Sequence, residues 1–341
     1  MMTSRERVLT TLRREEPDRV PYCELWVDRP LAAKLTDWQG HDAAFTALES
    51  NPYTVDEVKA LASSLGMDNI FYVLRAPVFA ETGLGADGRA FYGKGQITCE
   101  ADIERMVLPD PHDDALYAEA AAFAEQKGDY AAWLVTRVGI FSTIISMGLE
   151  GFSIALHENR PLVEAVLDRY TDWSVAVAEH VSALGFDVYA STDDMAFKSA
   201  PFFSPQVFRD LVLPRYRRVG EVLGLPWIIH SDGNLRPFVD DLLTLGIAGL
   251  HPNEKGAMDI RAMKRDYGDR LCLLGNVDLN LLGLASPEEV DAEVRGLIRD
   301  IAPGGGYIVT SGNSLASYLK PENCRAMAQA VRKYGQYPIS V

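Results

Sequence analysis

The sequence His230-Ser231-Asp232-Gly233 places an imidazole and a carboxylate two residues apart, directly after the apolar run 225–229. Imidazole nitrogen and carboxylate oxygen are both ligands of Zn²⁺, and both can act as acid or base. In the alternative reading, Asp232 only starts a turn, Gly233 takes a positive φ and His230 belongs to the core. Because His230 follows four apolar residues, where a buried strand opens into a loop, we favour a metal site containing His230 and Asp232.

Polar side chains also follow most of the other short apolar runs. They are Glu24 and Asp28, Arg75, Arg137, Asp193 and Asp194, His251 and Glu254, Asn276 and Asp278, and Ser311 and Asn313. Turns are polar in any protein, but turn formation alone does not require an ionisable or amide side chain at nearly every run end. We expect Glu254 to be a third metal ligand or an acid; otherwise it is a solvated charge near Lys255. His251, which precedes Pro252, fits equally well as a residue that only ends its strand.

The adjacent carboxylates Asp193 and Asp194 cannot both point the same way at the end of a strand. We expect one to face the cavity and the other to cap the next segment, and we favour Asp194 for the cavity. Phe197, followed by Phe202 and Phe203, either lines an aromatic substrate pocket or packs in the core.

Asn276, Asp278 and Asn313 follow the last two apolar runs, next to glycines that permit close backbone approach. Their amides and carboxylate can orient a bound ligand. The glycines at 304–306 precede a predicted strand instead of opening a helix, which argues against a phosphate-binding loop.

Eight short apolar runs must position these residues, and they alternate with helical patterns. The runs are Arg19–Trp26, Asn69–Leu74, Ala132–Val138, Phe186–Ala190, Pro226–Ile229, Ile247–Leu250, Leu271–Leu274 and Gly306–Thr310. The alternation favours a parallel β/α barrel over an open sheet, and in such barrels the working residues lie at the C-terminal ends of the strands.

Capping signals predict where several helices begin. Thr3 with Glu6 and Ser286 with Glu289 form capping boxes, and Ser204-Pro205 starts another helix. A final helix should open at Pro321 and stop near Gly335.

Residues 1–341 are expected to form a single domain. The connection between the second and third runs, about residues 76–131, is longer than a barrel loop needs, and Asp87-Gly88 predicts a hairpin turn within it. We interpret this connection as an insertion at the active-site face.

Composition narrows the function classes. The chain is 48% hydrophobic and 24% charged, and no apolar stretch approaches the roughly 18 residues of a membrane span. The N-terminus lacks the apolar region of a secretory signal, so we expect a cytoplasmic protein. The net charge of -15 argues against nucleic acid and anionic membranes as partners. The four widely spaced cysteines are expected to be reduced and structural.

A family likeness covers nearly the whole chain. The segments 4–9 with 17–21, Asp193-Asp194, Ser204-Pro205 with Pro214, His230–Gly233, Gly275–Asp278 and 305–313 together resemble the uroporphyrinogen decarboxylase superfamily. The resemblance implies a single distorted (β/α)8 TIM barrel with its site in the C-terminal mouth.

The superfamily contains decarboxylases and corrinoid-linked methyltransferases. Decarboxylases carry an N-terminal segment Arg-Gln-Ala-Gly-Arg-Tyr, whose arginines meet the many carboxylates of the substrate. This chain has the segment 22–29 there, and its Glu24 and Asp28 would repel such a substrate. The methyltransferase branch therefore fits the opening segment better.

That branch, typified by methylcobalamin:coenzyme M methyltransferases, holds zinc with a His-x-Cys pair and a later Cys after a Ser-Gly step. His230 matches the histidine, but Asp232 and Asn313 stand at the cysteine positions. Thiolates make a zinc-bound thiol more nucleophilic, whereas oxygen ligands leave the ion a stronger Lewis acid. An oxygen-rich site disfavours the coenzyme M reaction and suits the polarisation of an ether or hydroxyl oxygen.

The resemblance thus implies a corrinoid-dependent methyltransferase of O-demethylase type. It would move a methyl group from a small methoxylated or methylated compound to a corrinoid (cobalamin) carried on a separate protein. The expected roles are zinc binding by His230, Asp232 and Glu254, substrate orientation or proton transfer by Asp194, Asp278 and Tyr307, and substrate contact by Glu24, Trp26, Arg137, Phe197, Asn276 and Asn313. The alternatives are a lyase acting on another carboxylated ligand and a non-catalytic ligand-binding barrel.

Overall fold

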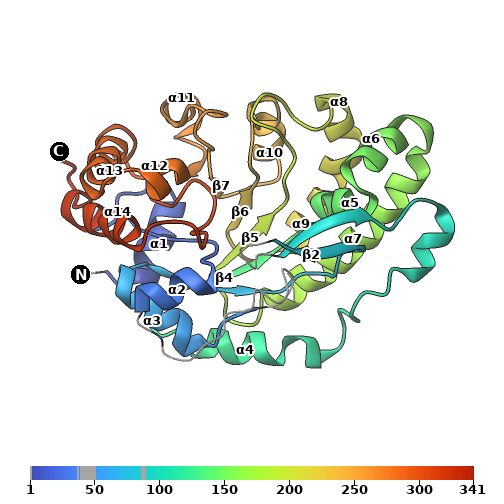
Figure 1. The fold of residues 1–341 in the computed structure, drawn as a ribbon, viewed down its shortest axis with the longest axis horizontal. Helices are drawn as coiled ribbons and strands as arrows, with labels where there is room; N and C mark the ends of the chain where they lie inside the picture. Colours follow the sequence, from blue (N-terminus) through green and yellow to red (C-terminus); the bar gives the residue numbers. More distant parts are fainter. Residues whose placement is uncertain (1, 37, 39–50, 86–89) are drawn as a thin grey trace.

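The computed structural model describes residues 2–36, 38, 51–85 and 90–341. In this part of the chain, seven parallel strands form one curled sheet with helices packed around it (Figure 1). In spatial order the strands are β1 (Asn69–Val73), β4 (Ala131–Thr136), β5 (Val188–Thr192), β6 (Trp227–His230), β7 (Gly249–His251), β8 (Cys272–Leu274) and β9 (Tyr307–Ile308). The strands are buried almost throughout, which explains why they appear in the sequence as continuous apolar runs.

The helices follow the strands in the alternating order expected of β/α units. Their bounds are α1 (Ser4–Leu12), α2 (Arg29–Thr36), α3 (Val55–Leu65), α4 (Ala118–Glu125), α5 (Ile140–Met147), α6 (Leu149–Glu158), α7 (Arg160–Val181), α8 (Pro205–Val207), α9 (Leu213–Val222), α10 (Val239–Leu243), α11 (Ile260–Tyr267), α12 (Leu279–Leu284), α13 (Pro287–Ile301) and α14 (Pro321–Tyr334). Four shorter helical turns are η1 (Glu100–Arg105), η2 (Asp114–Tyr117), η3 (Phe208–Val212) and η4 (Arg236–Phe238). No single helix among the described residues is long and apolar enough to span a membrane.

Seven of the eight predicted runs overlap a strand, but the first run, Arg19–Trp26, forms only isolated bridges. Tyr22 bridges to Val309 beside β9, and its carbonyl accepts a hydrogen bond of 2.7 Å from the backbone N–H of Asp68, next to β1. The segment therefore lies between the two outer strands of the sheet. Pro21 lacks an N–H, and the Asn69 side chain takes both backbone groups of Glu24, so a regular ladder does not form.

The long connection between β1 and β4 contains an antiparallel hairpin of β2 (Ala80–Leu84) and β3 (Ala90–Gly95), followed by η1, η2 and α4. The strands flank the predicted turn, while Asp87-Gly88 itself lies outside the described residues. The Tyr92 ring of β3 lies 5.9 Å from the Arg137 guanidinium, so the hairpin reaches the carboxyl end of β4.

The predicted helix starts are confirmed. Thr3 with Glu6 and Ser286 with Glu289 form complete capping boxes, and the Ser204 hydroxyl caps α8. Helix α14 runs from Pro321 to Tyr334, with Gly335 as its C-cap. All four cysteines are free thiols; Cys99 is exposed and the other three are buried.

Candidate metal site at the carboxyl ends of the strands

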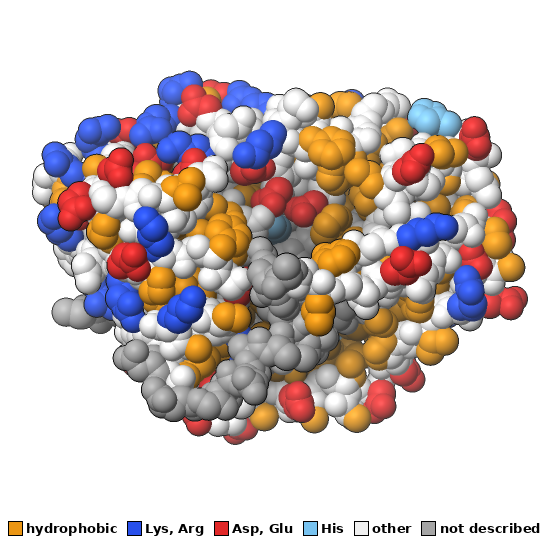
Figure 2. All heavy atoms as spheres, in the orientation of Figure 1, with side chains coloured by type: hydrophobic (Ala, Val, Ile, Leu, Met, Phe, Trp, Pro, Cys, Tyr) orange, Lys and Arg blue, Asp and Glu red, His pale blue; other side chains and the backbone are white. Residues whose placement is uncertain are grey.

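A cavity of about 200 Å³ opens at the carboxyl ends of the strands. Figure 2 shows this face, with acidic side chains and a histidine in a recess near its centre. The described residues that line the cavity are Leu25, Trp26, Asp28, Arg75, Val135, Arg137, Phe141, Thr192, Asp194, His230, Asn313 and Ser314. The predicted site residues Trp26, Arg137, Asp194, His230 and Asn313 are thus brought together from five separate segments of the chain.

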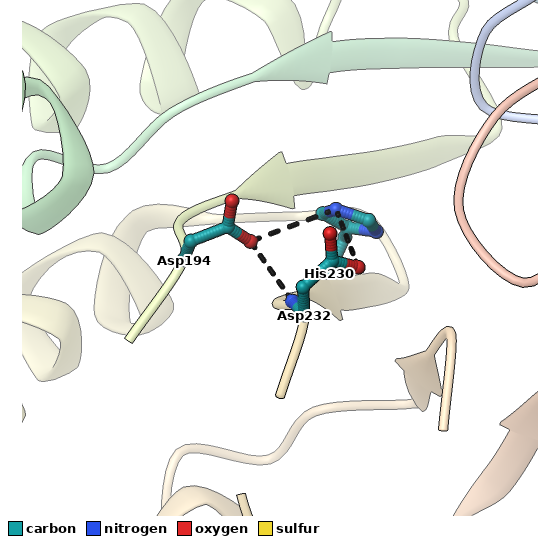
Figure 3. Close-up of side chains that lie close together, drawn as sticks. All are labelled: Asp194, His230 and Asp232. Atoms are coloured by element: carbon teal, nitrogen blue, oxygen red, sulfur yellow. Dashed lines mark hydrogen bonds and ion pairs between the residues drawn. The ribbon is translucent and has the colours of Figure 1, made fainter. Parts of the chain in front are cut away.

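His230 is the last residue of β6, Asp232 follows it by two residues, and Asp194 lies two residues beyond the neighbouring strand β5. The Nε2 atom of His230 is 3.8 Å from Oδ1 of Asp194 and 3.9 Å from Oδ1 of Asp232 (Figure 3). The backbone N–H of Asp232 donates to Oδ1 of Asp194 at 2.8 Å, which holds the two loops together. One ligand atom from each residue lies within 4.8 Å of the other two.

The distances between these ligand atoms fit a metal ion once the three side chains move slightly closer together. Zn²⁺ with nitrogen and oxygen ligands at about 2.0–2.2 Å in a tetrahedron places ligand atoms about 3.4 Å apart. Oδ1 of Asp232 is buried and has no hydrogen-bond partner among the described residues, while Oδ2 accepts a hydrogen bond from the Asn313 amide. A buried acceptor without a donor is costly, so a cation at Oδ1 would satisfy it.

The charges of the cluster also favour a cation. Burial, together with the charges of Asp194 and Glu254, raises the pKa of Asp232 to about 8. Burial lowers the pKa of His230. A metal ion binds carboxylate and neutral imidazole, and its charge would offset the repulsion among the carboxylates.

The third member of the cluster is Asp194, whereas the sequence predicted Glu254. Glu254 is otherwise engaged: its Oε2 accepts the Gly233 N–H at 2.9 Å, and its Oε1 pairs with Lys198 Nζ at 3.0 Å. Glu254 therefore anchors the turn that follows Asp232. Nothing in the local sequence identified Lys198 as its partner, because the two residues are brought together only by the loops.

The two adjacent carboxylates divide their roles as predicted. Asp194 lines the cavity, whereas the fully buried Asp193 accepts hydrogen bonds from the backbone N–H groups of Val138 and Gly139 at 2.7 and 3.1 Å. Asp193 thus fixes the start of α5 and, with it, the loop that carries Arg137.

Seven predicted site residues lie outside the set that lines the cavity: Glu24, Phe197, Asp232, Glu254, Asn276, Asp278 and Tyr307. Tyr307 is buried and its hydroxyl donates to the Gly275 carbonyl at 2.7 Å, and the Asn276 amide donates to the Asn253 carbonyl at 2.6 Å. Asp278 caps α12, and Phe197 is 53% exposed and packs edge-on against Phe202. The hydrogen bonds of Tyr307, Asn276 and Asp278 hold loops and strand ends in place.

Two residues that line the cavity, Phe141 and Arg75, were not assigned a role in the site from the sequence. Phe141, in the first turn of α5, lies beneath the Arg137 guanidinium at 5.4 Å from the ring centre. Arg75 donates to the Thr192 hydroxyl at 2.9 Å, which links the ends of β1 and β5. The position of Phe141 just after a predicted strand end was the one available signal.

Replacement of Gly233 by alanine is expected to lower the free energy of unfolding by about 3 kcal/mol or more and to weaken metal binding. Gly233 has a φ of +84°, and a Cβ there would lie 2.5 Å from the carbonyl oxygens of Ala196 and Phe197. Gly246→Ala is the matched control, since Gly246 has a φ of +75° but open space around it, so it should cost only about 1 kcal/mol. Urea unfolding measures both; equal losses would contradict the close-packing argument.

Glu24, predicted to contact substrate, instead points into the interior. Its carboxylate accepts the Ser311 N–H at 3.0 Å and the Ser311 hydroxyl at 2.6 Å, and burial raises its pKa to about 8. The folded protein therefore holds this proton more tightly than the unfolded chain, whose carboxyl has a pKa near 4.5. Its stabilising contribution is fully present below pH 4.5 and is lost as the pH rises through about 8.

Glu24→Gln should remove that pH dependence. Relative to the wild type, the metal-free variant is expected to gain roughly 2–4 kcal/mol in unfolding free energy between pH 4.5 and pH 8. Urea unfolding at both pH values measures this gain. Parallel pH profiles for the two proteins would contradict it.

Comparison with known proteins places the chain among enzymes of two activities. A family model described as uroporphyrinogen decarboxylase (URO-D) matches residues 3–334. The uroporphyrinogen decarboxylase of Alkalilimnicola ehrlichii is 23% identical over 351 residues, which cover 96% of this chain and 93% of the relative. The methylcobamide:CoM methyltransferase MtaA of Methanosarcina barkeri is 28% identical over 174 residues, which cover 51% of this chain and 49% of that enzyme.

A solved structure of a methyltransferase from Methanosarcina mazei is similar to the whole chain. It has a TM-score of 0.77 at 20% sequence identity and covers 98% of this chain and 99% of its own. At that identity the similarity demonstrates the shared fold.

Proposed function

Because the chain belongs to the uroporphyrinogen decarboxylase family, we propose that it is a corrinoid-dependent methyltransferase of O-demethylase type. It would transfer a methyl group from a small methoxylated or methylated compound to a corrinoid carried by a separate protein. The observation that carries the proposal is the cluster of Asp194, His230 and Asp232, of which Asp194 and His230 line the cavity. The similarity to a methylcobamide:CoM methyltransferase over half of the chain supports the same assignment.

The dimensions of the cavity support a small methyl donor. The described residues enclose about 200 Å³, which is below the roughly 300–1,000 Å³ of pockets for drug-sized ligands. Trp26 and Phe141 offer aromatic surface to such a donor, and Arg75 and Arg137 offer positive charge to an anionic substituent.

The donor set determines which methyl transfer is favoured. One imidazole and two carboxylates, with no thiolate, would hold zinc as a strong Lewis acid that polarises an ether or hydroxyl oxygen when bound. In the proposed reaction the methyl C–O bond would break with its electron pair left on the oxygen, and the pair of the new Co–CH₃ bond would come from the Co(I) of the reduced corrinoid. His230, Asp194 and Asp232 would hold the ion that binds the donor oxygen, and Asn313 would hold Asp232 through its amide.

A lyase acting on a carboxylated ligand is the second candidate. Arg75 and Arg137 line the cavity and could bind carboxylates, and a relative that matches nearly the whole chain is a uroporphyrinogen decarboxylase. A decarboxylase of this kind would function without the metal.

The two candidates are separated by an assay on protein purified without a histidine tag and loaded with zinc. The protein is mixed with a reduced corrinoid protein and a series of methoxylated aromatic compounds, and methylation is followed from the cobalt absorbance. Asp232→Asn, which keeps the side-chain shape but removes its charge, is the matched variant.

We expect methyl transfer by the wild type and a loss of about 100-fold or more in Asp232→Asn, since a metal ligand contributes more than the 10–100-fold typical of its outer partners. Absence of methyl transfer from every donor would contradict the proposal. Release of CO₂ from a carboxylated ligand by metal-free protein would support the lyase.

A further inference from the structure

Two histidines end neighbouring strands and meet behind the metal-site cluster. His230 and His251 are the last residues of β6 and β7, and their Cα atoms are register partners. Their Nδ1 atoms lie 2.6 Å apart, and both rings are buried. The contact is therefore a direct consequence of the strand register.

A hydrogen bond between two Nδ1 atoms requires a proton on only one of them. A neutral imidazole carries one N–H and one acceptor nitrogen, so one ring donates and the other accepts. The bond thus fixes a tautomer in each ring: the donor ring has a bare Nε2, and the acceptor ring has its proton on Nε2.

Metal binding at Nε2 requires the arrangement in which His230 donates from Nδ1. If His230 carried its proton on Nε2, that N–H would face Asp194 and Asp232 at 3.8 and 3.9 Å, beyond hydrogen-bond distance. With the proton on Nδ1, the Nε2 lone pair faces the space between the carboxylates, as a metal ligand must.

His251 then accepts at Nδ1 and carries its own proton on Nε2. The Nε2 atom of His251 is buried and has no hydrogen-bond partner among the described residues. His251 does not line the cavity, so its effect on the site passes through His230.

We propose that His251 is a positioning residue: its Nδ1 accepts the Nδ1 proton of His230 and so directs the His230 Nε2 lone pair between Asp194 and Asp232. This inference rests on the proposed function, because it assigns the lone pair to the proposed metal. A purely structural role for His251 would require only its volume in the core.

Two substitutions separate these roles. His251→Asn keeps an acceptor near the position of Nδ1, whereas His251→Leu keeps apolar volume and removes the acceptor. Zinc affinity is measured by competition with a chromophoric chelator. Thermal unfolding of the metal-free proteins shows that each variant is folded.

We expect the asparagine variant to bind zinc within about 5-fold of the wild type and the leucine variant to bind about 10–100-fold more weakly, the range found for partners of metal-ligating histidines. Equal affinities for the wild type and His251→Leu would overturn the proposal. So would an equal loss in both variants, since that would follow from volume or shape alone.

A second measurement does not depend on zinc or on the folding of the variants. In metal-free wild-type protein with ¹⁵N-labelled histidine, nitrogen chemical shifts report which ring nitrogen of His230 is protonated. We expect the proton on Nδ1; a proton on Nε2 would overturn the proposal. If the wild type binds no zinc, the metal in the proposed function fails, whereas the tautomer measurement still decides which of the two rings donates.

Discussion

Asp68→Asn is expected to lower the free energy of unfolding by about 3–5 kcal/mol, the usual cost of breaking a buried ion pair by removing one partner. Asp68 is fully buried beside β1, and its carboxylate accepts from Arg7 at 2.7 Å and from Arg19 at 2.8 and 2.9 Å. It also accepts the Tyr22 N–H at 3.0 Å, which holds the first apolar run against the sheet. Asparagine would remove the charge and present an N–H₂ group to a cluster of donors.

The matched control is Asp172→Asn, which breaks an exposed ion pair with Arg218 on the surface. Exposed pairs contribute about 0–1 kcal/mol, so this variant should unfold near the wild type. Urea unfolding with an unchanged slope measures both effects. A loss below about 1 kcal/mol for Asp68→Asn would show that the network does not hold the first run in place.

His230→Ala is expected to weaken zinc binding by at least about 100-fold and to reduce methyl transfer by a similar factor. The imidazole is the one nitrogen ligand of the cluster, and losing a ligand should exceed the 10–100-fold cost of losing its outer partner. The remaining carboxylates Asp194 and Asp232 would bind zinc only weakly, since two oxygen ligands leave most of its coordination to water.

His157→Ala, on the exposed face of α6, is the control for nonspecific binding of zinc by histidine. It should retain wild-type affinity and activity. Thermal unfolding shows whether His230→Ala is still folded. Stoichiometric zinc in a folded His230→Ala protein would place the metal elsewhere and contradict the site.

Much of the fold could be predicted because strands buried on both faces leave continuous apolar runs in the sequence. Seven of the eight predicted runs overlap a strand, and the helix caps at Thr3 and Ser286 form as predicted. The first run failed because its hydrogen bonds come partly from side chains such as Asn69, which local patterns do not reveal.

The site could be located from the sequence more reliably than its ligands could be assigned. His230 and Asp194 line the cavity because they follow strands whose carboxyl ends converge. In the structure Lys198 and the Gly233 N–H hold Glu254, and the acidic residue that lies closest to both His230 and Asp232 in the cluster is Asp194. The contact between His230 and His251 depends on the register of β6 and β7, which the sequence does not specify.

We propose that Asp194, His230 and Asp232 form an oxygen-rich zinc site at the carboxyl ends of the strands. X-ray absorption at the zinc edge of the stoichiometrically loaded protein tests it most directly. We predict a first shell of nitrogen and oxygen only, at about 2.0–2.2 Å, with the outer scattering of one imidazole. A zinc–sulfur distance of about 2.3 Å, or protein that retains no zinc, would contradict the account.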